Sequence, residues 1–249
     1  MTLAIRQFPC LSDNYGFLIR DEETGQVASI DSPDAGAILA ELDASGWGRL
    51  DFIFNTHWHP DHAGGNERLK AETGCFIIGP EEVRRIAPLD QPVADGDQVR
   101  LGDTSFYILD AGGHTLGHVA WWSRRAEVVF VGDCLFAMGC GRMFEGTPDQ
   151  FWASLERLAA LPPDTTAYCA HEYSEANARF ALSVDPSRAV AERAEVIFAQ
   201  RAQGLATVPT TIGLERATNP FLRAPRLRPD LDPAQAFAAL RAAKDNFVG

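Results

Sequence analysis

Several features are scarce in this chain of 249 residues, and each absence excludes a class of protein. Cysteine occurs five times, an odd number, and no two cysteines form a CxxC pair. This usage argues against a disulfide framework and for reduced thiols in the cytoplasm. No apolar run approaches the ~20 residues that cross a bilayer, and the N-terminus lacks the pattern of a secretory signal. We therefore expect neither a membrane segment nor export.

Positive charge is also in deficit. Lys and Arg total 22 against 34 Asp and Glu, a net charge of −12, so the chain lacks the basic surface that nucleic acid binding requires. The deficit is uneven, because residues 1–175 carry a net charge of −15 whereas residues 176–249 carry +3. All six histidines precede residue 172. This shift in composition predicts a boundary near residues 172–180.

Short apolar runs and helical patterns alternate through the first part of the chain, which predicts an α/β fold. The predicted strands cover residues 15–20, 27–30, 52–54, 75–78, 106–109, 119–122 and 128–131. Helices are predicted over residues 35–44, 63–73, 149–161 and 186–205, and from an N-cap at Asp232 with Pro233 to about Asn246. Prolines before Asp232 forbid a continuous helix there.

The densest group of metal-binding side chains follows the predicted strand 52–54. His57, His59, Asp61 and His62 lie within six residues. Side chains alternate along an extended segment, so His57 and His59 can bind one cation, while Asp61 and His62 can face a second. Imidazole and carboxylate suit Zn, Fe or Mn better than Ca or Mg. A solvated surface cluster would need neither the preceding strand nor the glycine pair that follows, so we predict metal binding.

Three later residues complete a possible metal shell. His114 follows the strand 106–109, Asp133 follows the strand 128–131, and His171 follows a short apolar segment. Taken singly, such residues are more often hydrogen-bonded core histidines or turn aspartates. Together with the first motif they provide five imidazoles and two carboxylates at strand ends, which suits a dinuclear site bridged by Asp133.

Four segments carry a resemblance to a known family. THWHPDHAGGN, GGHTLGH, VFVGDCLFAMGCGRMFEGT and LPPDTTAYCAHEY resemble the metallo-β-lactamase superfamily, and more narrowly the glyoxalase II, or hydroxyacylglutathione hydrolase, family. The resemblance extends over essentially the whole chain. It implies an αββα sandwich with a dinuclear site at one edge, in a catalytic domain of residues 1–172. It also implies a helical glutathione-binding domain of residues 173–249.

The family's metal ligands are all present in this chain. The resemblance assigns His57, His59 and His114 to the first ion, Asp61, His62 and His171 to the second, and Asp133 to the bridge between them. It implies two divalent ions as cofactors, with Zn expected and Fe or Mn accepted by the same donors.

The resemblance also implies a site for a glutathione thioester. The family's contacts correspond to Arg142, Phe144, Tyr173, Arg241 and Lys244. Arg241 and Lys244 share one helix face, and their charge suits the carboxylates of glutathione; without the resemblance, a solvated helix face is the alternative. Many members carry Lys and Tyr where this chain has Arg142 and Phe144. Arg142 keeps the charge, but Phe144 removes one hydroxyl donor.

Two residues near these motifs are not assigned as ligands. His118 either holds a ligand or a nearby loop by a hydrogen bond, or is a packed histidine at the start of a strand. Cys134, next to Asp133, is expected to be a small buried thiol.

The implied reaction is hydrolysis of S-D-lactoylglutathione and related S-2-hydroxyacylglutathiones, the second step of methylglyoxal detoxification. Two ions would lower the pKa of a shared water toward about 7, so that hydroxide attacks the thioester near neutral pH. Asp133 and Asp61 are the expected catalytic carboxylates, the first as bridge and the second by also orienting the hydroxide. The thiol leaving group has a pKa of about 8.5 and needs no dedicated acid.

We expect a monomer in the cytoplasm.

Other activities on related scaffolds are the alternatives. Another hydrolase of the superfamily, such as a lactonase or β-lactamase, would not need Arg241 and Lys244. A glutathione persulfide dioxygenase uses one iron and generally lacks the long helical C-terminal domain. A protein that only binds glutathione or metal would not need the complete ligand set. The sequence therefore favours thioester hydrolysis.

Overall fold

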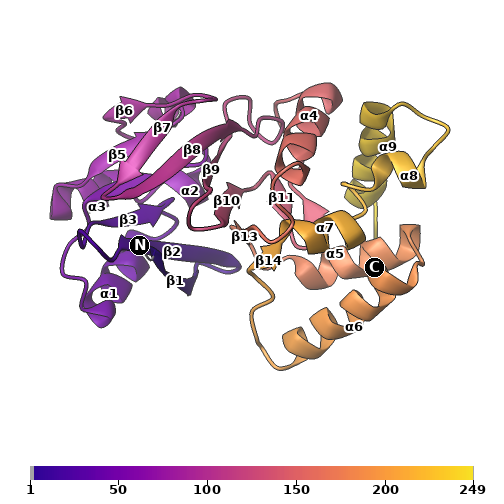
Figure 1. The fold of residues 1–249 in the computed structure, drawn as a ribbon, viewed down its shortest axis with the longest axis horizontal. Coiled ribbons are helices and arrows are strands. Elements are labelled where there is room, and N and C mark those ends of the chain that lie inside the picture. The colour runs from indigo at the N-terminus through magenta and orange to yellow at the C-terminus, as the bar shows by residue number, and fades with distance from the viewer. Residues whose placement is uncertain (1–2, 249) are drawn as a thin grey trace. The chain divides into compact units, whose positions relative to one another are not determined.

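The computed structural model describes residues 3–248, which form two compact units. Unit 1 comprises the residues up to Asp110 together with Gly117–Gly132. Unit 2 comprises Ala111–Leu116 and the residues from Asp133 onward. Figure 1 shows most of unit 1 in indigo to magenta and most of unit 2 in salmon to yellow. No helix within residues 3–248 combines the length and the hydrophobicity that crossing a membrane requires.

A six-stranded sheet forms the first layer of unit 1. Its strands have the spatial order β1 (Leu3–Cys10), β2 (Asn14–Asp21), β3 (Val27–Ile30), β4 (Phe52–Phe54), β5 (Phe76–Gly79) and β6 (Gln91–Pro92). The pairs β1–β2 and β2–β3 are antiparallel, whereas β3 to β6 run parallel. The strands predicted over residues 15–20 and 27–30 are confirmed as β2 and β3, which pair with Phe17 opposite Ile30.

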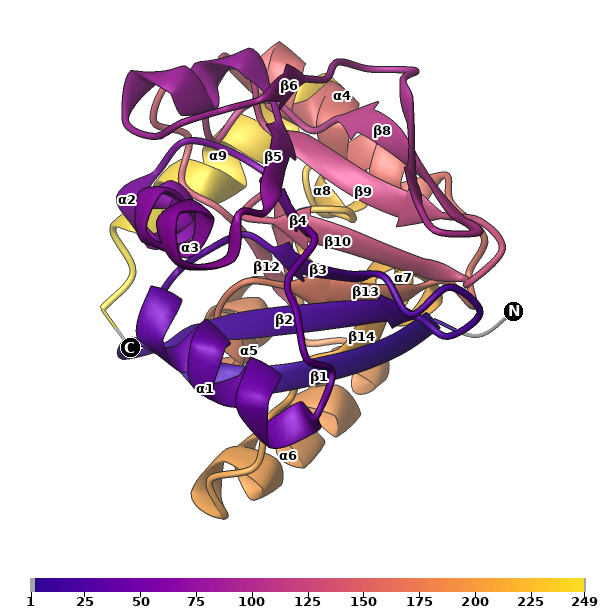
Figure 2. The same ribbon diagram turned by 90° about the vertical axis from the view of Figure 1, so that its left-hand side faces the viewer.

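Helices cover one face of this sheet. They are α1 (Ala35–Ser45), α2 (Pro60–Ala63), α3 (Asn66–Thr73) and the 3₁₀ helix η1 (Glu81–Arg85). Figure 2 shows α1, α2 and α3 on one side of the sheet. α1 begins where Asp34 accepts hydrogen bonds from the next turn and ends at Gly46 in the left-handed conformation. The helix predicted over residues 63–73 is instead divided, because α2 begins at Pro60 and the glycine pair separates it from α3.

Four antiparallel strands form the second layer of unit 1. They are β7 (Gln98–Leu101), β8 (Thr104–Asp110), β9 (Val119–Ser123) and β10 (Val128–Gly132). The inner faces of the two layers meet through aromatic side chains. Phe54 of β4 stacks on Trp121 of β9 with ring centroids 4.5 Å apart, and Phe17 of β2 contacts the ring of Phe130 of β10 at 5.7 Å. The core of unit 1 therefore lies between the sheets, and β4 and β10 lead to the predicted metal ligands.

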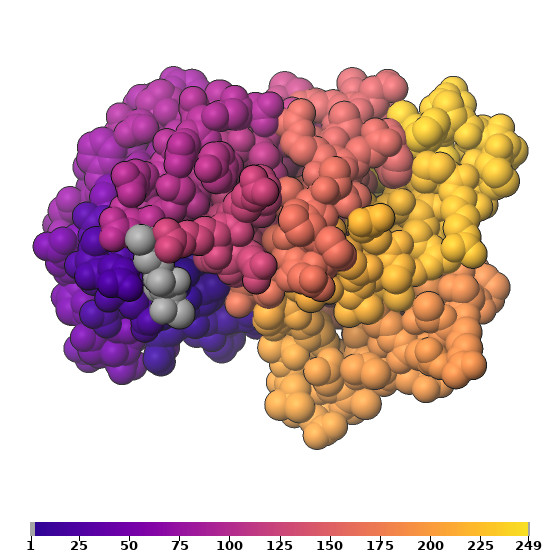
Figure 3. Space-filling view, viewed as in Figure 1, coloured from indigo at the N-terminus to yellow at the C-terminus, as the bar shows by residue number. Residues whose placement is uncertain are grey.

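Helices dominate unit 2. Its elements are β11 (Leu135–Phe136), β12 (Gly139–Cys140), α4 (Pro148–Ala159), β13 (Thr166–Cys169), α5 (Ser174–Val184), α6 (Arg188–Ala202), β14 (Thr210–Thr211), α7 (Ile212–Thr218), α8 (Ala224–Leu227) and α9 (Pro233–Asp245). α9 begins as predicted, since Asp232 accepts a hydrogen bond from the Gln235 amide at 2.9 Å. Figure 3 shows α6 in orange and α9 in yellow at the surface of this unit.

A buried carboxylate in unit 2 holds the β11–β12 hairpin, which follows Asp133. Glu215 of α7 is fully buried and pairs with Arg193 of α6. It also accepts hydrogen bonds of 2.9 Å from the Met138 amide and from the Asn219 side chain. A buried charge is tolerated only when paired and hydrogen-bonded in this way. The pairing therefore fixes the hairpin that leads to the candidate ligand pocket.

Some elements differ from the sequence prediction. β1 was not predicted, because most of its residues are only partly buried and its hydrophobic pattern is weak. α5 was not predicted either; its buried face consists mostly of small side chains such as Ala178 and Ala181. α8 lies in the proline-rich stretch, where Pro225 occupies the first turn that accepts proline. α6 is shorter than predicted, ending at Ala202.

Candidate metal centre and ligand pocket

Four of the seven predicted ligands belong to unit 1, where His57 and His59 follow β4 and Asp61 and His62 lie in α2. His57 Nε2 is 3.1 Å from His59 Nδ1, and His62 Nε2 is 3.5 Å from Asp61 Oδ2. His57 and His62 are buried, while His59 and Asp61 are partly exposed. The imidazole rings of His57 and His62 have centroids 4.0 Å apart. The segment from His57 to His62 therefore presents two pairs of donors within a few ångströms.

Asp31, at the end of β3, holds this segment in place. Its carboxylate accepts hydrogen bonds from the Thr56 amide at 2.7 Å and the Thr56 hydroxyl at 2.8 Å, and lies 2.8 Å from His62 Nδ1. Asp31 is buried and has a φ of 56°, in the left-handed region. Sequence reasoning missed this residue, although it carries the signal of the predicted ligands, a carboxylate directly after a strand. A partner at Nδ1 leaves Nε2 of His62 to bind an ion.

His118 packs against a predicted ligand within unit 1. It is fully buried, and its ring stacks on His57 with centroids 4.7 Å apart. Gly132, the last residue of β10, has a φ of 48°, and a Cβ atom there would lie 2.6 Å from His118 Nε2. Only glycine allows the strand to approach so closely. Whether His118 also holds a ligand by a hydrogen bond stays a prediction.

The three predicted ligands of unit 2 converge on one carboxylate. Asp133 Oδ2 lies 3.4 Å from His114 Nε2, and Asp133 Oδ1 lies 3.3 Å from His171 Nε2. All three side chains are buried. One imidazole therefore faces each carboxylate oxygen, which is the arrangement expected when a carboxylate bridges two cations.

Neighbouring groups orient these imidazoles. His114 Nδ1 lies 2.8 Å from the Arg142 carbonyl oxygen, which directs Nε2 toward Asp133. The ring of Tyr173 lies parallel to His171, with an interplanar angle of 2° and centroids 4.7 Å apart. An exposed aromatic ring therefore covers one face of the buried His171 imidazole.

The chemistry of these donors fits divalent metal ions. His57, His62 and His114 each place Nδ1 beside a protein oxygen, supplied by Thr56, Asp31 and the Arg142 carbonyl respectively. This is the outer-shell pattern that keeps the other ring nitrogen available for a cation. Imidazole combined with carboxylate is the donor set of transition ions such as zinc, iron and manganese.

A cavity of about 500 Å³ lies within unit 2 beside the Asp133 cluster. Its volume is in the range of sites for small molecules. Its lining includes two predicted metal ligands and every predicted glutathione contact: His114, Asp133, Arg142, Phe144, Tyr173, Arg241 and Lys244. The fold therefore gathers these residues, and their contact with a substrate stays a prediction.

Two arginines of this cavity share one carboxylate. Arg241 is buried, and its guanidinium donates to the Cys140 carbonyl oxygen at 2.9 Å and to Asp245 at 2.9 Å. Arg142 is largely exposed, with Nε 3.8 Å from Asp245. Sequence reasoning did not identify Asp245, although it follows Lys244 and lies one helical turn from Arg241. Arg142 is therefore the more accessible of the two guanidinium groups.

Lys244 is a partly buried cation of the same cavity. Its ammonium group donates a hydrogen bond of 2.7 Å to the Ala176 carbonyl oxygen. Burial lowers the pKa of Lys244 to about 8, and the nearby charges of Arg241 and Arg142 contribute to the same shift. Three cations against the two carboxylates of Asp133 and Asp245 leave the cavity with an excess of positive charge, which suits an anionic ligand.

Phe144 is the more exposed of two exposed aromatic residues in the described lining of the cavity, the other being Tyr173. Its side chain is 61% exposed, and its ring contacts the His114 imidazole edge-on at 5.2 Å. A hydroxyl group at this position would therefore reach the cavity, and its absence removes one donor.

The five cysteines are free and buried. Burial raises the pKa of the Cys10 and Cys169 thiols to about 12 and that of Cys140 to about 11. Thiols with raised pKa values are poor nucleophiles. Cys134 is fully buried, as expected for a packed thiol beside Asp133.

Comparison with known proteins shows the class first. The metallo-β-lactamase superfamily model matches residues 28–171, and the chain therefore belongs to this superfamily, as the predicted fold class required. Residues 172–247 match the model described as the hydroxyacylglutathione hydrolase C-terminus. The chain belongs, within the superfamily, to the hydroxyacylglutathione hydrolase family.

Relatives support this assignment over the whole chain. The sequence is 52% identical to the hydroxyacylglutathione hydrolase of Erythrobacter litoralis, over 98% of this chain and 100% of that protein. It is also 52% identical to the enzyme of the same name from Maricaulis maris, over 98% and 99%. Among solved structures, it is similar to ETHE1 from Myxococcus xanthus, with a TM-score of 0.71, 26% identity and coverage of 98% and 92%. The BLEG-1 B3 metallo-β-lactamase, with a TM-score of 0.68, 20% identity and coverage of 88% and 99%, shares the fold.

Proposed function

We propose that this protein hydrolyses S-D-lactoylglutathione and related S-2-hydroxyacylglutathiones to the 2-hydroxy acid and glutathione, the second step of methylglyoxal detoxification. The family assignment supports this activity. The observation that carries the proposal is the cavity of unit 2, in which Arg142 and Lys244 line the same surface as His114 and Asp133. An anionic thioester held by those cations would lie beside metal ligands.

The proposed metal centre uses donors from both units. We assign His57, His59 and His114 to the first ion, Asp61, His62 and His171 to the second, and Asp133 to the bridge. Zinc is the expected metal, with iron or manganese as alternatives of the same donor preference. A bound pair of such ions lowers the pKa of a water toward about 7 and polarises the thioester carbonyl.

The chain's own residues would position the substrate. Arg142 and Lys244 bind the glutathione carboxylates, and the Arg241 charge supports them from its buried place in α9. Phe144 and Tyr173 supply aromatic walls. Asp61, which is partly exposed, orients the attacking oxygen. The thiolate leaves without a general acid, because its conjugate thiol has a pKa of about 8.5.

We propose two domains, with the boundary after residue 172 that the sequence analysis predicts. Residues 1–172 form the catalytic domain, and residues 173–249 form the glutathione-binding domain, which supplies Tyr173, Arg241 and Lys244 to the cavity. We also propose that the protein acts as a monomer in the cytoplasm, without nucleic acid or membrane partners. Five free, buried thiols support a reducing compartment.

Thiol release from S-D-lactoylglutathione tests the proposed function. We expect the purified protein to release glutathione, to lose this activity with a chelator, and to regain it when zinc is returned. Oxygen uptake with glutathione persulfide, or hydrolysis of a β-lactam in preference to the thioester, would contradict the proposal in favour of one of the alternatives. Thiol release that survives removal of the metal would also contradict it.

A further inference from the structure

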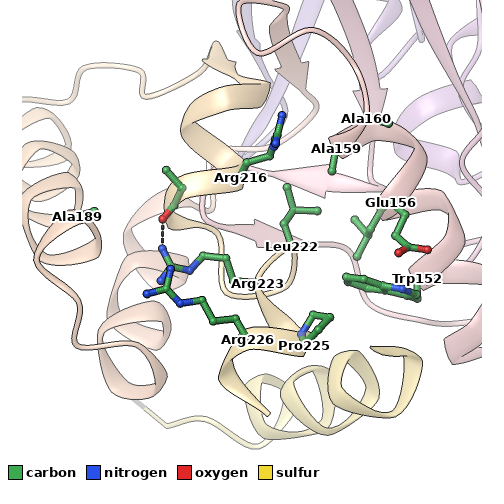
Figure 4. Close-up of a pocket in the computed structure, with 12 residues that line it drawn as sticks. Trp152, Glu156, Ala159, Ala160, Ala189, Arg216, Leu222, Arg223, Pro225 and Arg226 are labelled. Atoms are coloured by element: carbon green, nitrogen blue, oxygen red, sulfur yellow. Dashed lines mark hydrogen bonds between the residues drawn. The ribbon is translucent and has the colours of Figure 1, made fainter. Parts of the chain in front are cut away.

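Unit 2 contains a second cavity, of about 780 Å³, whose described lining residues are all different from those of the ligand pocket. We call it the Trp152 cavity. It lies between α4, α7 and the segment around α8, and Figure 4 shows its lining side chains. The residues that define its chemistry are Trp152, Glu156, Arg216, Arg223, Pro225 and Arg226.

Two arginines of the Trp152 cavity have no side-chain partner among the residues that the structure describes. Within residues 3–248, the side chains of Arg216 and Arg226 form no hydrogen bond or ion pair, and both residues are exposed. Arg228, two residues further along and outside the cavity, instead forms hydrogen bonds of 3.0 and 2.9 Å with Asp230. The arginines that line the cavity are therefore available to a ligand, while their neighbour is neutralised.

A third arginine, Arg223, lines the cavity with a side chain that other residues hold in place. Arg223 is nine-tenths buried, pairs with Asp185 at 2.8 Å, and donates a hydrogen bond to the Ala217 carbonyl oxygen. Its Nε atom is buried and has no hydrogen-bond partner within the described residues. A buried donor without a partner is costly in a folded protein, and a ligand oxygen would satisfy it.

The remaining lining is flat and apolar. Trp152 of α4 is partly buried, and Figure 4 shows its indole ring beside Pro225. Glu156 is the acidic residue of the lining, so the unpaired charge of the cavity is positive. Tryptophan and arginine together form the surfaces that bind aromatic anions, because the ring stacks and the guanidinium pairs with a phosphate or carboxylate.

We propose that the Trp152 cavity binds an organic anion that combines a planar aromatic ring with a phosphate or carboxylate group. The ring packs on Trp152 and Pro225, and the anionic group pairs with Arg226 and with the buried Nε of Arg223, whose side chain Figure 4 shows next to that of Arg226. A volume of about 780 Å³ accommodates a ligand of this size. This site is separate from the one that the proposed thioester would occupy.

Calorimetric titration of the zinc-loaded protein tests the site with three probes. 1-Naphthyl phosphate carries both features, inorganic phosphate carries only the charge, and 1-naphthol carries only the ring. Excess glutathione occupies the ligand pocket during the titration. We expect 1-naphthyl phosphate to bind at least roughly tenfold more tightly than either simpler probe, because each alone uses half of the site.

Matched variants locate the binding. Arg226→Gln and Trp152→Leu should each weaken 1-naphthyl phosphate binding roughly tenfold, whereas Arg228→Gln and Arg142→Gln should leave it unchanged. Arg226→Gln alters an exposed side chain, so it should keep its thermal midpoint and its thioesterase rate. Unchanged binding in Arg226→Gln, weakened binding in Arg142→Gln, displacement of the probe by glutathione, or equal affinity for all three probes would each overturn the proposal.

Discussion

The two units contribute different chemistry to the proposed reaction. Unit 1 contains four predicted metal ligands, two that follow β4 and two in α2, and Asp31 and His118 contact this group. Unit 2 supplies three donors around Asp133, together with a cavity that carries three cations. In the proposed function, unit 1 provides metal ligands alone, whereas unit 2 provides metal ligands and the cavity that would bind the substrate. Substitutions in unit 1 should therefore change metal content and kcat, and those in the cavity should change KM.

The largest expected effect comes from the proposed bridge. Asp133→Ala should lower kcat on the order of 1000-fold, because both ions would lose a shared ligand and several kcal/mol of stabilisation with it. Thiol-release assays combined with elemental analysis measure the effect. Asp103→Ala, an exposed aspartate paired only loosely with Arg100, is the control. Full metal content with full activity in Asp133→Ala would show that Asp133 is not a ligand of the metal centre.

Asp31→Asn should give the next largest effect. This substitution changes a contact within unit 1, which contains both Asp31 and His62. Asparagine tolerates the left-handed φ of 56° but no longer offers a carboxylate to His62, so zinc affinity should fall about 10- to 100-fold. Competition with a zinc chelator measures the affinity, and excess zinc should restore kcat. An unchanged zinc affinity would show that Asp31 only stabilises the fold.

Lys244→Gln isolates the contribution of unit 2 to substrate binding. Loss of one charge-assisted contact should raise KM for S-D-lactoylglutathione about tenfold and leave kcat and zinc content unchanged. Steady-state kinetics and elemental analysis give the two readouts. A fall in kcat with an unchanged KM would instead place Lys244 in the chemical step.

The pH dependence of KM is a second test of the contribution of Lys244 to substrate binding. With its pKa lowered to about 8, Lys244 is cationic below pH 8 and neutral above it. Attraction for the substrate carboxylate is therefore present at pH 7 and is lost as the pH rises to 9, so KM should rise toward the Lys244→Gln value. Initial rates corrected for spontaneous hydrolysis measure this rise. An equal rise in the Lys244→Gln variant would exclude Lys244 as its origin.

The smallest expected effect comes from adding the hydroxyl group that many family members have at the position of Phe144. Phe144→Tyr adds a donor at an exposed position of the cavity and should lower KM roughly two- to fivefold, which is the value of one neutral hydrogen bond. The matched change Phe136→Tyr, at a buried aromatic ring of the same cavity, should bring no such gain. An equal or higher KM in Phe144→Tyr would show that the substrate does not reach this position.

Local patterns in the sequence account for much of this arrangement. The strands that lead to the donors have compact apolar runs, and the cluster from His57 to His62 is evident because its members are adjacent. His114, Asp133 and His171 are ambiguous singly, since only the fold shows that each imidazole faces one oxygen of Asp133.

Other features depend on contacts between distant residues. Asp31 directly follows a strand, as the predicted ligand Asp133 does, but its partner His62 lies 31 positions later, so the sequence does not show what Asp31 binds. Arg241 is predicted to contact glutathione, and nothing in the sequence indicates that its guanidinium is buried against the Cys140 carbonyl oxygen, 101 positions earlier. No periodicity reports such a partner, because the pairing depends on how the β11–β12 hairpin and α9 fold within unit 2.

A crystal structure of the zinc-loaded protein, with anomalous diffraction recorded at the zinc edge, tests the central claim most directly. We predict two anomalous peaks on opposite sides of the Asp133 carboxylate, one bound by His57, His59 and His114 and the other by Asp61, His62 and His171. A single peak, or two peaks that Asp133 does not touch, would contradict the proposed shared centre.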